Sequence, residues 1–446
     1  MARMPKLQKP QAPGVHPRRL WSIRPASDRQ SGDAVVSNFV LHWFPAKALK
    51  DSLAWRYSLW LGTVSAALLL LLVLSGFPLL FLHVPSVERA YGSVKDIEYA
   101  VTFGYWIRSV HRFAAHFMVA AVFLHLVRVF LTGAYRNGTG RDQHREWNWV
   151  LGIGMLLLTL FLSFTGYLLP WDQLAYWAVT VGTNIASAVP LIGPQIRELL
   201  LGGRNIDQPT LIRFYALHII VLPGALGALF AYHMWRIRKD GGLASADHAA
   251  TLPSKAESSP SSTKTYTLLG VARGTGPTIR TFSTEAANAT VNSVPDLTRR
   301  IAIVVLGTIA AVSILAVFIH SPLEEPANPL VTPNPAKAPW YFLWLQEIVT
   351  DTTIKLGSFT VNGALVGGVI LPGLLIAWLA VWPWMDKSPA EAVGRWFPRS
   401  RRTQNLVFLA LVLVVLALTF VGTFCRGPYW HFYWPWQSWP ELPKRI

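Results

Sequence analysis

Seven apolar segments, each about as long as a membrane-spanning helix, constrain the fold of this chain more than any other feature. A helix that crosses a bilayer needs about 20 mostly apolar residues. The segments lie at Tyr57–Leu82, Trp106–Thr132, Trp149–Leu169, Leu211–Trp235, Ile301–His320, Gly363–Trp382 and Gln404–Phe424. Only 14% of the 446 residues are charged, whereas soluble domains carry about 25%. The sequence therefore predicts an all-α, polytopic membrane protein with seven transmembrane helices in the lipid bilayer.

The positions of the basic residues indicate how these helices are oriented. The net charge is +17, and 26 of the 40 Lys and Arg residues lie in the N-terminal segment and the loops after the second, fourth and sixth spans. Only nine lie in the other loops and the C-terminal tail. Because cytoplasmic loops collect Lys and Arg, we expect the N-terminus inside and the C-terminus outside. The basic charge is thus a topology signal, and no nucleic-acid partner is expected.

Composition divides the chain into four parts. Residues 1–56 are a basic N-terminal segment on the inner side, and residues 57–240 form a four-helix module. The Ser-, Thr-, Ala- and Pro-rich stretch Ala244–Ser293 predicts a flexible inner linker over residues 241–298. Residues 299–446 form a three-helix module.

The single cysteine, Cys425, excludes a disulfide framework, a zinc cluster and a cysteine-held iron–sulfur centre within this chain.

Four histidines inside the second and fourth spans are the first candidates for chemistry, because ionisable residues in a membrane are costly. His111 and His125 are 14 residues apart, which places them about 40° from a common helix face and about 21 Å apart along the axis. His218 and His233 are 15 residues apart, about 60° off, with a similar rise. Two tiers of paired imidazoles suit two non-covalent b haems with both axial positions of the iron filled. We predict an outer pair, His111–His218, and an inner pair, His125–His233.

Glycines and arginines near these histidines support the same interpretation. The first span contains Gly62 and Gly76, and the third contains Gly152 and Gly166; each pair is again 14 residues apart. Glycine lets a flat macrocycle approach the backbone. Two arginines next to the predicted ligands could pair with haem propionates, Arg112 and Arg128.

A lone histidine in a membrane helix is more often a helix–helix hydrogen-bonding residue than a haem ligand. His116 illustrates that alternative, because it lies five residues after His111, about 140° around the helix and off the ligand face. We interpret His116 as structural. The glycine period has a similar alternative, which is plain helix packing.

Three stretches resemble cytochrome b of the Rieske/cytochrome b complexes. They are WIRSVHRFAAHFMVAAVFLHLVRVFLTGAY (Trp106–Tyr135), TGYLLPWDQLAYWAV (Thr165–Val179) and LIRFYALHIIVLPGALGALFAYH (Leu211–His233). The resemblance covers about residues 39–240. Residues 321–347 (SPLEEPANPLVTPNPAKAPWYFLWLQE) and the last three spans resemble the three-helix subunit IV of plastoquinol-oxidising complexes, here fused to the first module.

The chain departs from the family pattern at two positions. In the split complexes a cysteine on the first helix tethers an extra haem, and Trp60 stands there, so no covalent haem is expected. The family's outer quinol site has a Pro-Glu-Trp-Tyr motif, and this chain has Ala338-Pro339-Trp340-Tyr341. Such a replacement is similar to what menaquinol-using members show.

Another group must then accept the quinol proton. Glu347 is the nearest downstream acid, and Asp172 lies beside the quinol pocket by resemblance. For Glu347, a loop-capping or ion-pairing role on the surface is an equally open alternative.

The resemblance implies a quinol:cytochrome c-type oxidoreductase in a bacterial inner (cytoplasmic) membrane. Quinol would dock near Trp171–Trp177 and Pro339–Tyr341, with Trp340 and Tyr341 as site residues. One electron would pass to a Rieske iron–sulfur protein and the other through both haems to a quinone on the inner side. The Rieske protein and a c-type cytochrome would be separate subunits of a homodimeric complex.

Two other functions remain open from the sequence. A haem b anchor of a quinone-linked dehydrogenase would also carry paired histidines, but it would not need the PWDQ segment or the three-helix module. A proton-coupled transporter could use intramembrane His and Arg residues. Transporters of that type usually contain broken-helix repeats, and no internal repeat is evident.

Overall fold

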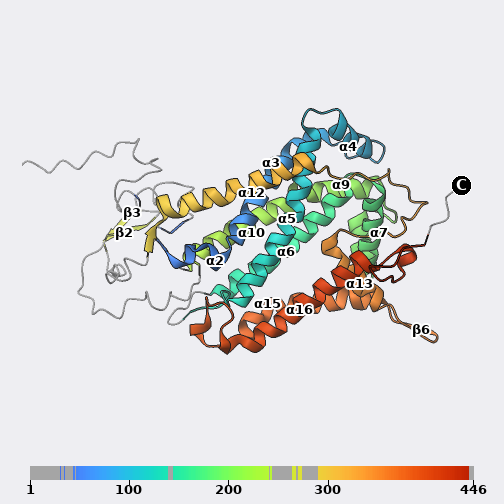
Figure 1. The fold of residues 1–446 in the computed structure, drawn as a ribbon. Coiled ribbons are helices and arrows are strands. Elements are labelled where there is room, and N and C mark those ends of the chain that lie inside the picture. The colour runs from blue at the N-terminus through green and yellow to red at the C-terminus, as the bar shows by residue number, and fades with distance from the viewer. Residues whose placement is uncertain are drawn as a thin grey trace, which may run out of the picture.

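The computed structural model describes residues 31, 35, 44–45, 47–138, 144–240, 242–243, 264–267, 270–273 and 290–440. Within these residues, seven helical segments are long and apolar enough to cross a membrane. They are Leu61–Leu82, Gly104–Leu131, Arg145–Leu168, Gln208–Lys239, Ser293–Phe318, Gly363–Met385 and Arg399–Cys425. The predicted all-α fold with seven long apolar helices is confirmed (Figure 1).

Three of the segments are single α-helices, and four contain an additional turn. The main helices are α3 (Leu61–Leu82), α5 (Gly104–Leu131), α6 (Arg145–Leu168), α9 (Gln208–Ala216), α10 (Leu222–Lys239), α12 (Thr298–Phe318), α14 (Gly363–Leu365), α15 (Leu371–Met385) and α16 (Arg402–Phe420). Turns of π-helix join α9 to α10 and α14 to α15, and similar turns precede α12 and follow α16. A 3-10 turn precedes α16.

The first span begins later than the apolar pattern predicts. The short helix α2 (Trp55–Ser58) ends where Leu59 and Trp60 adopt left-handed φ angles of 50° and 53°, and α3 then starts at Leu61. Left-handed backbone costs about 1–2 kcal/mol per non-glycine residue. The chain therefore turns sharply just before the Gly62 position.

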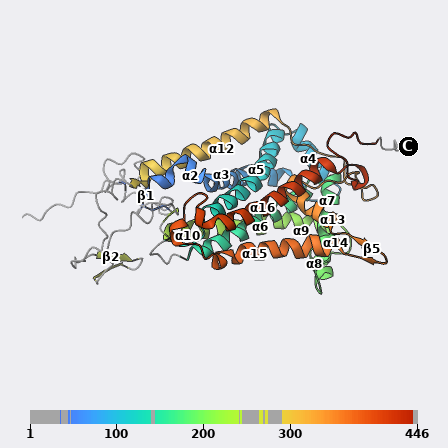
Figure 2. The same cartoon turned by 60° about the horizontal axis from the view of Figure 1, so that its bottom comes forward.

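Shorter helices gather at one end of the bundle. They are α4 (Ala90–Tyr99), α7 (Gln173–Ser187), α8 (Gly193–Leu201) and α13 (Trp340–Asp351). The C-terminal tail and the hairpin of β5 (Lys355–Leu356) and β6 (Phe359–Thr360) lie at the same end (Figures 1 and 2). We call it the α7–α13 end. Asp172 caps α7, because its side chain accepts a hydrogen bond from the Ala175 N–H.

A pair of short strands lies at the opposite end. β1 (Lys47–Leu49) pairs antiparallel with β4 (Thr290–Asn292), with Lys47 opposite Asn292. We call it the β1–β4 end. The strands β2 (Lys264–Thr267) and β3 (Gly270–Arg273) form a hairpin within the predicted linker. The rest of Ala244–Ser293 up to residue 289, and most of residues 1–56, lie outside the described residues.

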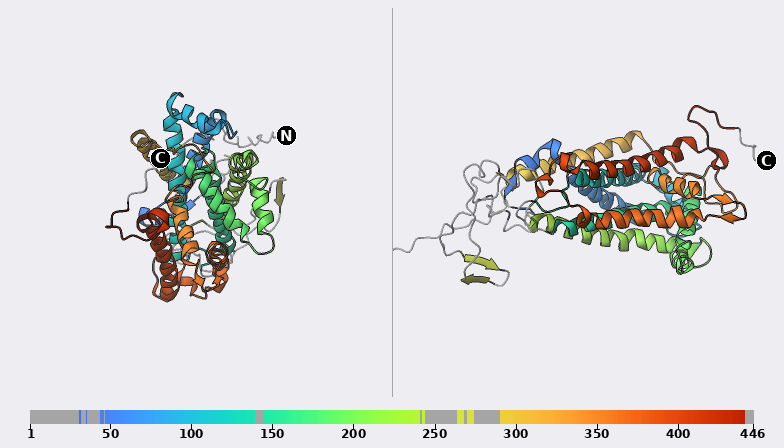
Figure 3. Two further views of the ribbon diagram at one scale, coloured as in Figure 1. Left: turned by 90° about the vertical axis from the view of Figure 1, so that its right-hand side faces the viewer. Right: turned by 90° about the horizontal axis from the view of Figure 1, so that it is seen from below.

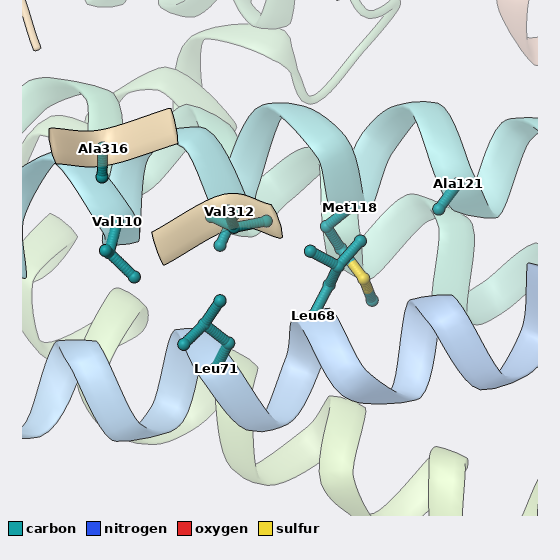
Figure 4. Close-up of a cluster of buried hydrophobic side chains, with 8 residues drawn as sticks. Leu68, Leu71, Val110, Met118, Ala121, Val312 and Ala316 are labelled. Atoms are coloured by element: carbon teal, nitrogen blue, oxygen red, sulfur yellow. The ribbon is translucent and has the colours of Figure 1, made fainter. Parts of the chain in front are cut away.

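The two modules pack along their length rather than touching only at their ends (Figures 1 and 3). α12 lies along α3 and α5, where Leu68, Leu71, Val110, Met118 and Val312 form a buried cluster (Figure 4). The apolar side chains of α3, α5 and α12 are in van der Waals contact with one another, and such packing favours association of helices in a membrane. The fifth span is thereby fixed against the first and second.

α15 and α16 pack against α5 and α6 through aromatic side chains. The Phe130 and Phe408 rings stack with centroids 3.8 Å apart, and the Trp149 indole donates a hydrogen bond to the Leu379 carbonyl oxygen at 2.6 Å. Close by, the Arg401 guanidinium, which has no exposed surface, donates to Asp386 at 3.3 Å. Arg401 also donates to the Phe130 carbonyl oxygen at 3.0 Å and to the Tyr135 hydroxyl at 2.7 Å. The three-helix module is therefore held against the first module by buried polar contacts as well as by apolar ones.

Candidate functional site

Two of the predicted ligands face each other between α5 and the π-helical turn Leu217–Val221. The His111 and His218 rings have centroids 6.2 Å apart and planes at 74°. Two imidazoles on opposite sides of one metal, each about 2 Å from it, place their ring centres roughly 6 Å apart. The separation therefore leaves room for one metal ion between the two rings. We call this pair the His111 tier.

The second pair lies further towards the β1–β4 end. His125 packs against α3, where a Cβ built on Gly62 would lie 3.3 Å from the His125 Cε1 atom. His233 of α10 is an electrostatic neighbour of His125. We call these two residues the His125 tier. Among the described residues no group of three or more His, Cys, Asp and Glu side chains converges, so these arrangements are pairs.

The π-helical turn explains how His218 and His233, 15 residues apart, can pair with His111 and His125, which are 14 residues apart. In an ideal α-helix, His218 and His233 would be about 60° out of alignment. The turn Leu217–Val221 contains His218 itself, and a π-bulge accommodates one extra residue. The remaining residues of the span then follow α-helical geometry, so the two histidines come closer to a common face. Pro223 directly follows this turn, in the first positions of α10.

Three of the four predicted glycines lie directly against a predicted ligand. A Cβ on Gly76 would lie 3.1 Å from His111 Cε1, and a Cβ on Gly166 would collide with His218 Cε1. Gly62 has the corresponding contact with His125. A Cβ on Gly152 meets nothing within 4 Å and faces open space. The glycine pattern therefore marks the positions where α3 and α6 approach the imidazoles.

Two hydroxyl groups, which the sequence pattern did not single out, contact the His111 tier. The Ser75 Oγ atom lies 3.0 Å from Nδ1 of His111, and the Thr165 Oγ1 atom lies 3.3 Å from Nδ1 of His218. Both residues directly precede a glycine of the 14-residue pattern, Gly76 and Gly166. That Ser-Gly and Thr-Gly pairing is the signal that could have identified them.

The two arginines next to the predicted ligands have different surroundings. The Arg112 guanidinium donates to the Pro322 carbonyl oxygen at 2.9 Å. Arg128 is only 4% exposed, and its Nε and Nη2 atoms have no hydrogen-bond partner in the described part of the chain. The unpaired donors of the buried Arg128 suit a side chain that faces an anionic group in the bundle, whereas Arg112 already donates to a backbone carbonyl oxygen. For the four histidines, the donor set and the glycine contacts fit two bis-imidazole haems.

The residues predicted for quinol binding lie at the α7–α13 end. Trp340 begins α13, and its indole donates a hydrogen bond to Nδ1 of His116 at 3.1 Å. The Tyr341 ring lies 5.7 Å from the His116 ring, and burial raises the pKa of Tyr341 to about 12. His116 therefore connects α5 to the Trp340–Tyr341 pair, a contact that helix periodicity alone does not reveal.

Asp172 lies on the same side of the molecule as Tyr341. Both are electrostatic neighbours of Tyr167 on α6. Asp172 is 5% exposed, and burial raises its pKa. Its carboxylate accepts hydrogen bonds from the backbone N–H groups of Ala175 at 2.9 Å and Glu324 at 3.4 Å.

Glu347 has a different environment from Asp172. It is 1% exposed, so it is not a surface carboxylate, and it forms an ion pair with Arg426 beyond the end of the last span. The Arg426 Nε atom donates to both carboxylate oxygens, at 2.9 and 3.0 Å. Arg426 also reaches Asp351 at 3.3 Å. The structure thus brings Asp172, Tyr341 and Trp340 to one region and places Glu347 beside Arg426.

Comparison with known proteins extends these observations. Two family models match the chain: Cytochrome b/b6/petB over residues 47–241 and Cytochrome b(C-terminal)/b6/petD over residues 326–436. Cytochrome b6 of Prochlorococcus marinus is 42% identical over 181 residues, which are 41% of this chain and 80% of that protein. Cytochrome b6 of Synechocystis is 37% identical over 218 residues, 46% of this chain and 96% of that protein.

A solved structure has a similar fold. It is described as a hyperthermophilic respiratory Complex III, and it matches with a TM-score of 0.65 and 23% identity over 85% of this chain and 86% of that chain. At that identity the match supports the fold alone. The assignment of the chain to a family rests on the family models and the cytochrome b6 relatives. The chain belongs to the cytochrome b/b6 family, as a bc-type cytochrome b in which a petD-like part follows the b6-like part in one polypeptide.

Proposed function

We propose that this chain oxidises quinol at the α7–α13 end, as the cytochrome b subunit of a bc-type quinol:cytochrome c oxidoreductase, and carries electrons across the membrane. The observation that supports this most is the His111–His218 pair, whose ring centres lie 6.2 Å apart against Gly76 and Gly166. A second histidine tier towards the β1–β4 end would complete a path between the two membrane faces.

His111 and His218 would hold one b haem, and His125 and His233 the other, without a covalent bond to the protein. When bound, each haem would supply one-electron redox chemistry for electron transfer. Glycines at positions 62, 76, 152 and 166 would leave room for the flat rings. Arg112 and Arg128 would pair with the propionates.

Trp340, Tyr341 and Asp172 would form the quinol site, with His116 fixing the Trp340 indole. The Tyr341 hydroxyl shares a hydrogen bond with Ser163 and is protonated at neutral pH, so it could donate to a bound quinol. Pro339 stands where the family motif has an acid. That replacement supports menaquinol as the substrate, by resemblance to members that use it.

The quinol proton needs an acceptor within hydrogen-bond reach, directly or through one water. Glu347 is our first candidate, because Arg426 can stay paired with Asp351 when Glu347 becomes neutral. Asp351 is half-exposed and one helical turn from Glu347, so a proton could leave along that face of α13. Asp172 is the alternative acceptor, since burial already raises its pKa towards neutrality.

The family also suggests the partners and the location. A Rieske iron–sulfur protein would take the first electron at the α7–α13 end, and a c-type cytochrome would follow it. The complex would be a homodimer in a bacterial inner membrane. The N-terminus and the β1–β4 end would face the cytoplasm, as the distribution of Lys and Arg predicts, and the C-terminus would lie outside.

Turnover of the purified complex tests this proposal. The intact complex should show a b-type band in a reduced-minus-oxidised spectrum and should reduce cytochrome c faster with a menaquinol analogue than with a ubiquinol analogue. Trp340→Phe keeps an aromatic ring but removes the hydrogen bond to His116, and we expect a higher KM for quinol with both haems retained. Absence of a b-type band would refute the haem assignment. Faster turnover with ubiquinol would refute menaquinol alone.

A further inference from the structure

Arg128 is the most unusual cation in the described part of the bundle. It is 4% exposed, and two of its nitrogen atoms, Nε and Nη2, have no hydrogen-bond partner among the residues that the structure describes. No described carboxylate lies within ion-pair distance of it. A buried guanidinium with unpaired donors is strongly unfavourable unless an acceptor completes it. The donors of Arg128 are therefore available to an acceptor from outside the described residues.

The position of Arg128 indicates which group this is. Arg128 follows His125 by three residues in α5, and residues at that spacing lie on one helix face. His125 packs against Gly62 at the point where a flat ring could approach α3. A carboxylate at the edge of a haem held by His125 would supply the acceptor that Arg128 lacks. This step rests on the proposed ligation by His125 and His233.

The side chain of Tyr57 contacts the guanidinium of Arg128. The guanidinium carbon lies 4.7 Å from the centre of the Tyr57 ring, and the two side chains also share a hydrogen bond. A cation over an aromatic face is attracted by the ring, and the attraction is stronger where both groups are desolvated. Tyr57 lies in α2, immediately before the left-handed residues Leu59 and Trp60. Strained backbone of this kind persists where the surrounding structure fixes it.

The three-helix module holds Tyr57 in turn. The Trp396 indole, in the connection between α15 and α16, donates a hydrogen bond to the Tyr57 carbonyl oxygen at 3.1 Å. The two residues are 339 positions apart in the chain. At the other tier the same module contacts Arg112 directly, through the Pro322 carbonyl oxygen. Each predicted propionate arginine is thus supported by the second module, by a different route.

We propose that Tyr57 and Trp396 are positioning residues that fix Arg128 against a carboxylate of the haem in the His125 tier. A cation at that edge neutralises negative charge near the iron, and reduction adds an electron there. Arg128 therefore favours the reduced form and raises the midpoint potential of this haem. The petD-like module would in this way tune a haem that its own residues do not ligate.

The test is a redox titration of both haems in the intact purified complex, followed by optical spectra. Arg128→Gln should shift the reduction equilibrium of the His125-tier haem about tenfold towards the oxidised form, which is about 59 mV for one electron. Tyr57→Phe and Trp396→Phe should shift the same haem about threefold in the same direction. The other haem should keep its potential in all three variants, and haem content should be unchanged in the two Phe variants.

Trp382→Phe is the matched control, because it removes an indole hydrogen bond to the Tyr135 hydroxyl outside this chain of contacts. Unchanged potentials in both Tyr57→Phe and Trp396→Phe would overturn the positioning role. An equal shift in Trp382→Phe would also overturn it, since general loosening of the module would then be the cause. Failure of the proposed ligation would show separately, as two intact haems in His125→Ala.

Discussion

The Ser75 Oγ atom lies 3.0 Å from Nδ1 of His111, and this contact assigns the proton on the imidazole. Ser75 already donates its hydroxyl hydrogen to the Leu71 carbonyl oxygen at 2.7 Å. With that hydrogen engaged, the Ser75 oxygen is free to accept from Nδ1–H of His111, and the Leu162 carbonyl oxygen, which can only accept, lies 3.1 Å from Nδ1 of His218. That tautomer leaves the Nε2 lone pair available for a metal. Thr165, which donates to Phe161, has the same relationship with His218.

Ser75→Ala should weaken haem binding in the His111 tier. Removal of a partner of a metal-bound histidine typically costs 10–100-fold in metal affinity, so we expect this haem to dissociate at a concentration of detergent or competing apo-protein that the wild type tolerates. Haem stoichiometry by pyridine haemochrome assay measures the effect. Ser65→Ala is the control, because Ser65 makes the same helical contact, to the Leu61 carbonyl oxygen. An equal loss in both variants would mean that Ser75 acts only on the helix.

Gly166→Ala should lower occupancy of the same tier without unfolding the bundle. A Cβ at position 166 would collide with His218, whereas one at Gly227 meets nothing within 4 Å. Gly227→Ala is therefore the matched control on α10. The ratio of the two haems, read from low-temperature spectra, checks the prediction. Normal occupancy in Gly166→Ala and Gly76→Leu together would show that the glycine period serves helix packing alone.

Glu347→Gln should slow quinol oxidation by about 10²–10⁴-fold if Glu347 accepts the proton, with both haems still bound and reducible from the inner side. Stopped-flow reduction by quinol measures this rate. Arg426→Gln breaks the same ion pair but keeps the Glu347 carboxylate. It therefore separates the loss of the proton acceptor from the loss of the ion pair. Wild-type rates in Glu347→Gln, together with slow oxidation in Asp172→Asn, would move the role to Asp172.

The Asp386 carboxylate predicts a pH-dependent attachment of the three-helix module, because it accepts a hydrogen bond from the Tyr135 hydroxyl at 2.7 Å and pairs with Arg136 at 3.5 Å, both in the first module. Burial opposes the charged carboxylate, but hydrogen bonds from Tyr135 and Ser388 and the charge of Arg401 outweigh it and lower the pKa of Asp386. A lowered pKa in the folded protein stabilises it above about pH 4, and this contribution is lost as the pH falls through the folded value.

Thermal unfolding in detergent between pH 7 and pH 3 measures this effect. Asp386→Asn should lose about 3–5 kcal/mol at neutral pH, because the buried Arg401 guanidinium loses its only carboxylate partner among the described residues. The variant should also lose the acid-dependent part of the wild-type profile. A variant as stable as the wild type at pH 7 would show that the Asp386 carboxylate does not hold the two modules together.

Local patterns in the sequence predicted the seven helices and the positions of the four candidate ligand histidines. An apolar run gives the length of a helix, and the spacing of residues along it gives the face on which each side chain lies. The same reasoning left His218 and His233 about 60° out of alignment. The π-helical turn at Leu217–Val221 reduces that difference, and no residue pattern in an apolar run specifies such a turn. The left-handed backbone at Leu59 and Trp60 was likewise invisible in the apolar pattern of the first span.

Contacts between residues far apart in the chain could not be predicted from the sequence pattern. His116 looked structural from its helix face, yet it accepts the Trp340 hydrogen bond 224 positions away. The pairing of Glu347 with Arg426, and of Trp396 with Tyr57, also depends on how the last three helices pack against the first four. These are tertiary relationships, and periodicity carries no information about them.

Haem stoichiometry in His125→Ala tests the central claim most directly, which is that two histidine pairs bind two b haems. We predict that the purified variant retains one haem per chain, in the His111 tier, with its spectrum unchanged. Two haems per chain with both wild-type spectra would contradict the assignment of His125 as a ligand.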